Sequence, residues 1–219
     1  MRPLARFLLL ASCLTLGINA FAKEPLRVGV SPDYPPLAYK DHGQLTGIDV
    51  AAAEVLGQQL NRTVEFVEKD FNQLIPALQG GEIDIIMSGM TITAARGEKV
   101  SFSKPYLNAG QMAIIRFADA GQFGFKGAIF RPGARVAVQK NTTSEDFAAK
   151  SLKNANITHC DSADEAFRLL KSGKVDFLVH DAATSWSLAT DKSKQDLMSL
   201  NTELTDEQLG WAVKKDNQV

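Results

Sequence analysis

The chain has 219 residues, of which 45% are hydrophobic and 22% are charged. These values are typical of a globular protein with one sizeable domain or two small lobes. The formal net charge of −1 gives no indication of a nucleic-acid partner, and the sequence contains no P-loop, dinucleotide-binding fingerprint or G-x-S-x-G motif.

The first 22 residues predict a cleavable signal peptide. Arg2 and Arg6 precede an apolar run, and Ala20-Phe21-Ala22 forms a small-x-small cleavage site. A retained membrane helix is the alternative, but the run is short and is broken by Gly17 and Asn19. We therefore expect export to the periplasm.

The segment "LASC", which ends at Cys13, also resembles the lipobox of bacterial lipoproteins. In that case the cysteine would become the lipid-modified first residue. The residues that follow it are apolar and do not form a polar tether, so soluble export is favoured over anchoring at Cys13.

From Leu26 onward the hydrophobic pattern predicts alternating strands and helices. The first series comprises a strand over 26–30, a helix from Ile48, a strand over 64–67, a helix over 71–81 and a strand over 83–87. Asp49 is placed to favour the N-terminus of the helix that begins at Ile48, because negative charge stabilises that end.

A second series begins at Arg135. It comprises a strand over 135–139, a helix over 142–150, a strand over 156–160, a helix over 162–174 and a strand over 175–181. The second of these helices opens with a capping box, in which Glu165 follows Ser162 by three residues.

Two segments, "FNQLIPALQGGEIDIIMSG" and "ADEAFRLLKSGKVDFLVHD", resemble each other. Each reads as a helix, a glycine stop, an apolar-Asp pair and an apolar strand with a polar end. Chance similarity between helix–strand units is the alternative explanation. Because ligands of open α/β sheets bind at the carboxyl ends of the strands, two lobes facing one cleft would bring both polar ends to one ligand.

In the first series, the residues after the strand over 83–87 could bind a carboxylate. Thr93 can cap a short helix that carries Arg96, whose guanidinium could hold a carboxylate in bidentate fashion. A surface ion pair of Arg96 with Glu98 is the alternative. Nearby, Ser88 and Thr91 supply hydroxyl groups, and Gly89 allows the backbone to approach a ligand closely.

In the second series, Thr142 and Thr143 lie where a strand turns into a helix, so their amides could bind an anion, although simple capping is the alternative. Asp181 ends a strand, where its carboxylate could hold an ammonium group, or it could simply cap the following helix. Tyr34 and Phe71 follow strands and could flank a ligand or stack on a cation, although packing in the core is the default for Phe71.

Taken together, these groups are complementary to an α-amino acid zwitterion. Its carboxylate would meet Arg96 and the amide of Thr143, and its ammonium group would meet Asp181. Both charges must be matched, because burying either one without a partner would be very costly.

Four segments resemble, in order, the extracellular solute-binding proteins of family 3, the polar amino acid receptors of bacterial ABC importers. They are "GIDVAAAEVLG", "MTITAARGEKVSFSKPY", "VAVQKNTTSEDF" and "VDFLVHD", and the second is the most specific. The resemblance covers almost all of the chain after the signal peptide.

The resemblance implies the two-lobed periplasmic-binding-protein type II fold, in which each lobe is a mixed α/β sheet flanked by helices. Two hinge strands, here "MAIIR" and "WAVKK", would join the lobes. We expect lobe 1 over 23–115, lobe 2 over 116–212 and the start of a return to lobe 1 over 213–219. The family usually continues for a further helix or more, so we expect part of the cover of lobe 1 to be missing after Val219.

Carried over by motif, the resemblance assigns the ligand α-carboxylate to Arg96, with Thr91 and the Ser88–Gly89 backbone beside it. Thr143 would add a backbone contact, and Asp181 would bind the α-amino group. The aromatic walls would be Tyr34 and Phe71. One departure from the family pattern is Asn141, which stands where glycine is common.

The function expected from the resemblance is that of a non-enzymatic, monomeric receptor, which passes an amino acid to the permease of an ABC transporter in the inner membrane. No cofactor or metal is expected, since His42, His159 and His180 show no metal-ligand spacing. One alternative is a dehydratase of the cyclohexadienyl or arogenate type, and another is a ligand-sensing module.

The dehydratase would need an acid–base group in the cleft. The sequence offers only the neighbours His180 and Asp181, and adjacent side chains of a strand point to opposite faces.

Overall fold

The computed structural model describes residues 23–188 and 195–215. The predicted signal peptide, including Cys13, and the last residues of the predicted return to lobe 1 lie outside this part. Within it, no helix is both long enough and apolar enough to cross a lipid bilayer.

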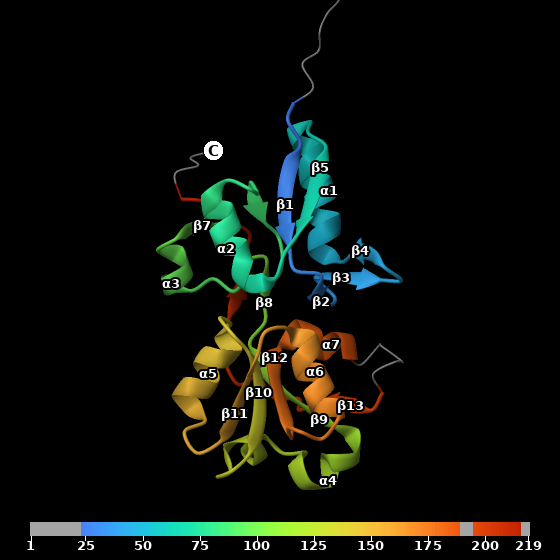
Figure 1. The fold of residues 1–219 in the computed structure, drawn as a ribbon, viewed down its shortest axis with the longest axis vertical. Coiled ribbons are helices and arrows are strands. Elements are labelled where there is room, and N and C mark those ends of the chain that lie inside the picture. Colours follow the sequence, from blue (N-terminus) through green and yellow to red (C-terminus); the bar gives the residue numbers. More distant parts are fainter. Residues whose placement is uncertain (1–22, 189–194, 216–219) are drawn as a thin grey trace, which may run out of the picture.

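The chain forms two α/β lobes that follow one another along the long axis of the molecule (Figure 1). The sheet of lobe 1 has the strand order β5-β1-β6-β15-β7. These strands are β5 (Val64–Glu68), β1 (Leu26–Val30), β6 (Ile85–Ile86), β15 (Ala212–Lys214) and β7 (Val100–Phe102). A small sheet of β2 (Asp33–Tyr34), β3 (Ala38–Asp41) and β4 (Gln44–Thr46) lies beside it.

Lobe 2 has the strand order β11-β10-β12-β9-β13. These strands are β11 (Asn156–Cys160), β10 (Arg135–Gln139), β12 (Phe177–Asp181), β9 (Gln111–Arg116) and β13 (Leu197–Ser199). In each lobe three neighbouring strands pair parallel, and one strand, β15 in lobe 1 and β9 in lobe 2, pairs antiparallel with both of its neighbours. This confirms the expected mixed sheets.

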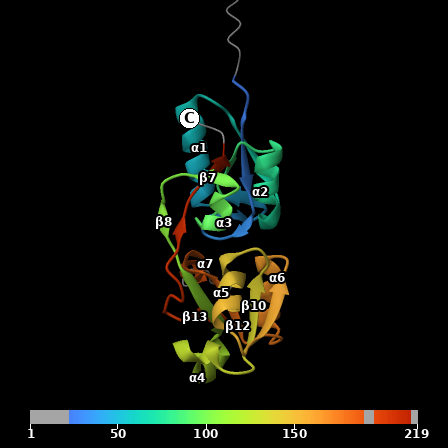
Figure 2. The same cartoon turned by 90° about the vertical axis from the view of Figure 1, so that its left-hand side faces the viewer.

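Helices cover both faces of each sheet. In lobe 1, α1 (Ile48–Leu60) and α2 (Phe71–Gly80) lie on opposite faces (Figure 2), and α3 (Ala94–Gly97) follows β6. The helical segments of lobe 2 are η1 (Phe117–Asp119), α4 (Ala120–Phe123), η2 (Lys126–Phe130), α5 (Thr143–Ser151), α6 (Ala163–Lys171) and α7 (Ala182–Leu188). On β10, Val136 and Val138 pack in one core with α5, whereas Ala137 packs in another with α6, because alternate side chains face opposite sides of a strand.

The two lobes share an arginine–aspartate contact at corresponding positions. On β1, Arg27 donates from its backbone and its side chain to Asp84, the residue just before β6. On β10, Arg135 donates to Asp176, just before β12, in the same way. Each guanidinium also donates to the carbonyl of a glycine just after the helix that leads to the aspartate. These glycines are Gly81 after α2 and Gly173 after α6. The similarity of the two helix–strand segments in the sequence is therefore a structural repeat.

The chain crosses between the lobes twice, through β8 (Leu107–Asn108) and β14 (Gln208–Leu209), which pair antiparallel. This differs from the expected hinge strands, since "MAIIR" belongs to β9 in the sheet of lobe 2 and "WAVKK" to β15 in the sheet of lobe 1. The boundary at 115/116 therefore falls inside lobe 2, and the return to lobe 1 begins before residue 213. Both strands are hydrogen-bonded to a neighbouring strand on each side, and β9 is also mostly buried, so they are parts of the lobes themselves.

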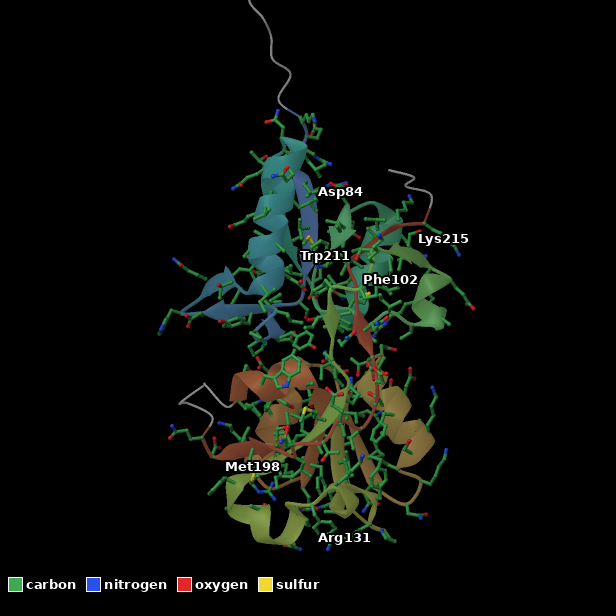
Figure 3. The ribbon with its side chains drawn as sticks, turned by 180° about the vertical axis from the view of Figure 1, so that it is seen from behind. Asp84, Phe102, Arg131, Met198, Trp211 and Lys215 are labelled. Atoms are coloured by element: carbon green, nitrogen blue, oxygen red, sulfur yellow. The ribbon has the colours of Figure 1, made fainter. Side chains whose placement is uncertain are left out.

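The carboxylate of Asp49, near the start of α1, joins three separate segments of lobe 1. It accepts hydrogen bonds from the backbone of Gly89 (2.7 Å), the hydroxyl of Tyr106 (3.0 Å) and the indole of Trp211 (3.0 Å). Tyr106 precedes the first crossing, and Trp211, which is labelled in Figure 3, follows the second. The side chain is completely buried, and burial raises the pKa of its carboxyl group. Asp49 therefore does more than stabilise the helix terminus, the role predicted for it.

We predict that Asp49→Asn lowers the free energy of unfolding by about 3 kcal/mol. In asparagine an NH2 group replaces one of the two carboxylate oxygens. This group would face at least one of the three donors, and that donor would lose its acceptor. Unfolding in urea measures the change. The control is Glu54→Gln on the exposed side of α1, which should change the free energy by less than about 0.5 kcal/mol. Equal effects of the two substitutions would contradict the prediction.

Candidate ligand-binding site

A cleft between the lobes gathers most of the residues that the sequence singled out. It holds about 420 Å³ of space not filled by protein atoms, counting its open mouth. The predicted residues that line it are Tyr34, Phe71, Gly89, Thr91, Arg96, Thr142, Thr143 and Asp181. They follow the carboxyl ends of strands in both lobes, where ligands of open α/β sheets bind.

Ser88 is the one predicted site residue that does not line the cleft. It is buried, and its hydroxyl accepts a hydrogen bond from the backbone of Ser31 (2.8 Å). It thereby joins the end of β6 to the end of β1. Its role in the structure is to hold these two strand ends together.

On the side of lobe 1, Arg96 lies in α3, which begins as predicted at the cap Thr93. Its guanidinium lies 5.2 Å from the centre of the Phe71 ring and donates to the carbonyl of Thr91 (2.9 Å). Burial lowers its pKa, and no ion pair of Arg96 occurs in the described part of the chain. The surface pairing with Glu98 is therefore not observed. A second guanidinium N–H group donates to the carbonyl of Asn141 in lobe 2 (3.2 Å), and the donors that remain are available to an anion.

Gly89 allows the backbone to approach the ring of Tyr34. Its φ is +60°, in the left-handed region that glycine adopts without strain, and a Cβ there would overlap the Tyr34 ring and Leu37. The hydroxyl of Tyr34 in turn donates to the carboxylate of Asp181 across the cleft (2.5 Å). Burial, and next the negative charge of Asp181, raise the pKa of Tyr34, so Tyr34 is a neutral donor.

On the side of lobe 2, Asp181 ends β12 and accepts hydrogen bonds from Tyr34 and from the side-chain amide of Gln111. Burial raises the pKa of its carboxyl group. His180 also lines the cleft and lies 5.2 Å from the Tyr34 ring, measured between ring centres. Strand alternation turns these neighbours to opposite faces, as expected: His180 stacks on Phe167 of α6, whereas Asp181 contacts Gln111 on the side of α5. Both residues still line the cleft, because the strand ends there.

The start of α5 supplies the other contacts of lobe 2. Thr142 takes the cap position, but its hydroxyl donates back to the carbonyl of Gln139 (2.7 Å), which leaves the first amides of the helix without a side-chain cap. Asn141 has φ +59°, a left-handed conformation that asparagine tolerates better than most residues. Asparagine therefore fits a turn at which the family commonly has glycine.

Several lining residues were not predicted: Asp33, Gln139, Ser144, Ala163 and His180. Asp33 could have been found, because it precedes Tyr34 in "SPDYPP" and therefore follows the same strand. Its carboxylate accepts a hydrogen bond from the hydroxyl of Ser31 (2.8 Å). Asp33 adds a second carboxylate to the cleft beside Asp181.

The chain is similar to known proteins over most of its length. Residues 26–218 match the family described as bacterial extracellular solute-binding proteins, family 3. ABC transporter arginine-binding protein 1 of Escherichia coli K12 is 30% identical, over 100% of this chain and 88% of that protein. Cyclohexadienyl dehydratase of Pseudomonas aeruginosa is 32% identical, over 72% of this chain and 59% of that protein.

Among solved structures, an ancestral amino acid-binding protein described as a precursor of cyclohexadienyl dehydratase is 39% identical to this chain. The TM-score is 0.80, and the match covers 88% of this chain and 82% of the other.

We predict that Gly89→Ala disrupts the cleft, because the added methyl group overlaps the Tyr34 ring and the residue must hold a left-handed backbone. The control is Gly81→Ala, which has a similar φ of +77° but open space around the added methyl group. Gly81→Ala should cost only about 1 to 2 kcal/mol of unfolding free energy. Gly89→Ala should cost more and should also shift the NMR signals of the Tyr34 ring. Equal losses of unfolding free energy in the two variants, with unchanged NMR signals of the Tyr34 ring, would contradict this account of Gly89.

Proposed function

Since this chain belongs to the bacterial extracellular solute-binding proteins of family 3, we propose that it captures an amino acid between its lobes and delivers it to an ABC importer in the inner membrane. The observation that carries the proposal is the placement of Arg96 and Asp181 on opposite sides of one cleft. These are two desolvated groups of opposite charge, as an amino acid zwitterion requires.

Each charge of a bound amino acid has a partner in this proposal. The α-carboxylate meets the free guanidinium donors of Arg96 and the uncapped amides at the start of α5. The α-ammonium group meets Asp181, whose two oxygens Tyr34 and Gln111 already orient. Phe71, below the guanidinium, keeps water from one face of the ion pair.

The charges that line the cleft favour a ligand with a cationic side chain. Once Arg96 and Asp181 are matched by the zwitterion, the carboxylate of Asp33 remains. The adjoining groove, which shares Asp33 with the cleft, is lined by further carboxylates, those of Asp41, Asp70 and Asp164. It also holds Lys40, whose ammonium group is paired with Glu68. The similarity to an arginine-binding protein supports the same class, so the ligand that we propose is a basic amino acid, with L-arginine as its test case.

The dehydratase is the second candidate. It is favoured by the presence of His180 and Asp181 together beside the hydroxyl of Tyr34, a set of groups that could transfer protons, and by the similarity to cyclohexadienyl dehydratase. The receptor accounts for the same groups without catalysis, because Asp181 binds an ammonium group and His180 packs against Tyr34. Turnover of prephenate or arogenate by the wild-type protein would decide for the enzyme.

We predict that L-arginine raises the unfolding temperature of the mature protein, by a stabilisation of about 2.7 kcal/mol at a hundredfold excess over Kd. Arg96→Ala and Asp181→Asn should each weaken binding at least tenfold, because each removes a charge-assisted contact worth about 1.5–3 kcal/mol. Calorimetric titration measures the affinities. A folded protein that responds to none of the common amino acids would refute the receptor.

A separate prediction concerns Asp33→Asn. This substitution should weaken the binding of L-arginine about ten- to a hundredfold and change that of L-glutamine little, because only arginine carries a side-chain charge. Glu54→Gln, on the exposed side of α1 and outside both the cleft and the groove, serves as the control and should leave both affinities within about threefold. Equal losses for the two amino acids would show that Asp33 does not select the side chain.

A further inference from the structure

We infer that Gln111 is a positioning residue. Its side chain determines which groups on the lobe 2 side of the ligand site donate hydrogen bonds and which accept them, and it links these groups to the second crossing between the lobes. The inference rests on the proposed function, because it names what orients the ligand contacts of that same site. Gln111 is the first residue of β9, is completely buried and does not itself line the cleft.

The side-chain amide of Gln111 contacts three residues that line the cleft on lobe 2. Its nitrogen donates to one carboxylate oxygen of Asp181 and to the hydroxyl of Thr143 (3.0 Å). Its oxygen accepts a hydrogen bond from the hydroxyl of Ser144 (2.6 Å). The opposite orientation of the amide would put its oxygen against a carboxylate, which can only accept, so this orientation is fixed.

The consequence for the site is a set of defined donors and acceptors. Tyr34 donates to one oxygen of Asp181 and Gln111 donates to the other, so the carboxylate is held in one plane. The hydroxyl of Thr143 accepts from Gln111, which leaves its own proton free to be donated into the cleft. One amide thus orients both an acceptor for an ammonium group and a donor for a carboxylate.

The backbone of Gln111 is fixed to the chain segment that returns to lobe 1. Its N–H group donates to the hydroxyl of Thr205 (2.8 Å), and its carbonyl accepts from the backbone of Leu204 (2.7 Å). Thr205 donates in turn to Glu207 (2.7 Å), whose other carboxylate oxygen lies 3.4 Å from the amide nitrogen of Gln111. At the preceding residue, Gly110, a Cβ would overlap the carbonyl of Thr205, so the two segments are in direct contact.

Three acceptors therefore share the two protons of one amide group: Asp181, Thr143 and Glu207. The contact with Glu207 (3.4 Å) is longer than that with Thr143 (3.0 Å), and it links the ligand contacts to the second crossing. A movement of that crossing changes which acceptors the amide can serve. Gln111 thus couples the orientation of the site to the hinge.

The test replaces Gln111 by methionine, which has a similar length but cannot donate. In wild-type protein and in Gln111→Met, the carboxyl titration of Asp181 is followed by ¹³C NMR without ligand, and the affinity for L-arginine is measured by calorimetry. We expect the pKa of Asp181 to rise in the variant, because the charged form loses a donor, while His180, Tyr34 and Glu207 around it are unchanged. The affinity for L-arginine should fall about ten- to a hundredfold.

The matched control is Ile115→Val on the same strand, where the side chain is completely buried. It should lower the stability of lobe 2 and leave both the Asp181 titration and the L-arginine affinity unchanged. If Gln111→Met does not fold, Gln111→Glu keeps the size and the contact with Ser144. It places a second carboxyl group beside Asp181, so it should raise the pKa of Asp181 and weaken binding of L-arginine.

The outcomes separate the inference from the proposed function. A wild-type protein that binds no amino acid refutes the receptor, while the titration of Asp181 still tests the role of Gln111. If the wild type binds L-arginine, the inference is overturned by a Gln111→Met variant in which both the titration of Asp181 and the affinity for L-arginine are unchanged. If the wild type does not bind it, an unchanged titration of Asp181 alone overturns the inference.

Discussion

The buried carboxylate of Asp49 is the contact on which the arrangement of lobe 1 depends. Its three donors come from the loop after β6, from the segment before the first crossing and from the segment after the second crossing. A charge in the protein interior is tolerated only when donors satisfy it, so these segments are held at fixed positions. The position of Gly89 then places the ring of Tyr34, whose hydroxyl reaches Asp181 in the other lobe. The cleft is thus assembled outward from one side chain that never contacts it.

Local patterns in the sequence predicted most of the helices and strands, because their causes are local. Apolar spacing identified α1, α2 and the parallel strands, and the caps Thr93 and Ser162 accept the expected backbone hydrogen bonds. The polar strand ends also predicted the cleft, since strands that run parallel bring their carboxyl ends to one edge. Arg96 follows β6 and Asp181 ends β12, and both residues line this cleft.

Contacts between distant segments could not be predicted in the same way. Asp49 was interpreted as a helix-end charge and Ser88 as a ligand contact, because their partners lie 40 or more positions away along the chain. Gln111 was not noticed at all, since a single polar residue at the start of an apolar strand gives no signal by itself. The crossings were misplaced for a similar reason. Their strands are only two residues long, whereas the longer apolar strands beside them are parts of the sheets.

The repeated arginine–aspartate contacts lie at the amino ends of the parallel strands, whereas the ligand site lies beyond the carboxyl ends; Asp84 marks this outer end of lobe 1 in Figure 3. The contacts that hold the strands together and the residues that would bind a ligand therefore lie at opposite ends of each sheet. Side chains in the cleft can be exchanged during evolution without loosening the contacts that fix the strands. Such a scaffold is free to acquire new ligands, or a new chemistry, at little cost in foldability.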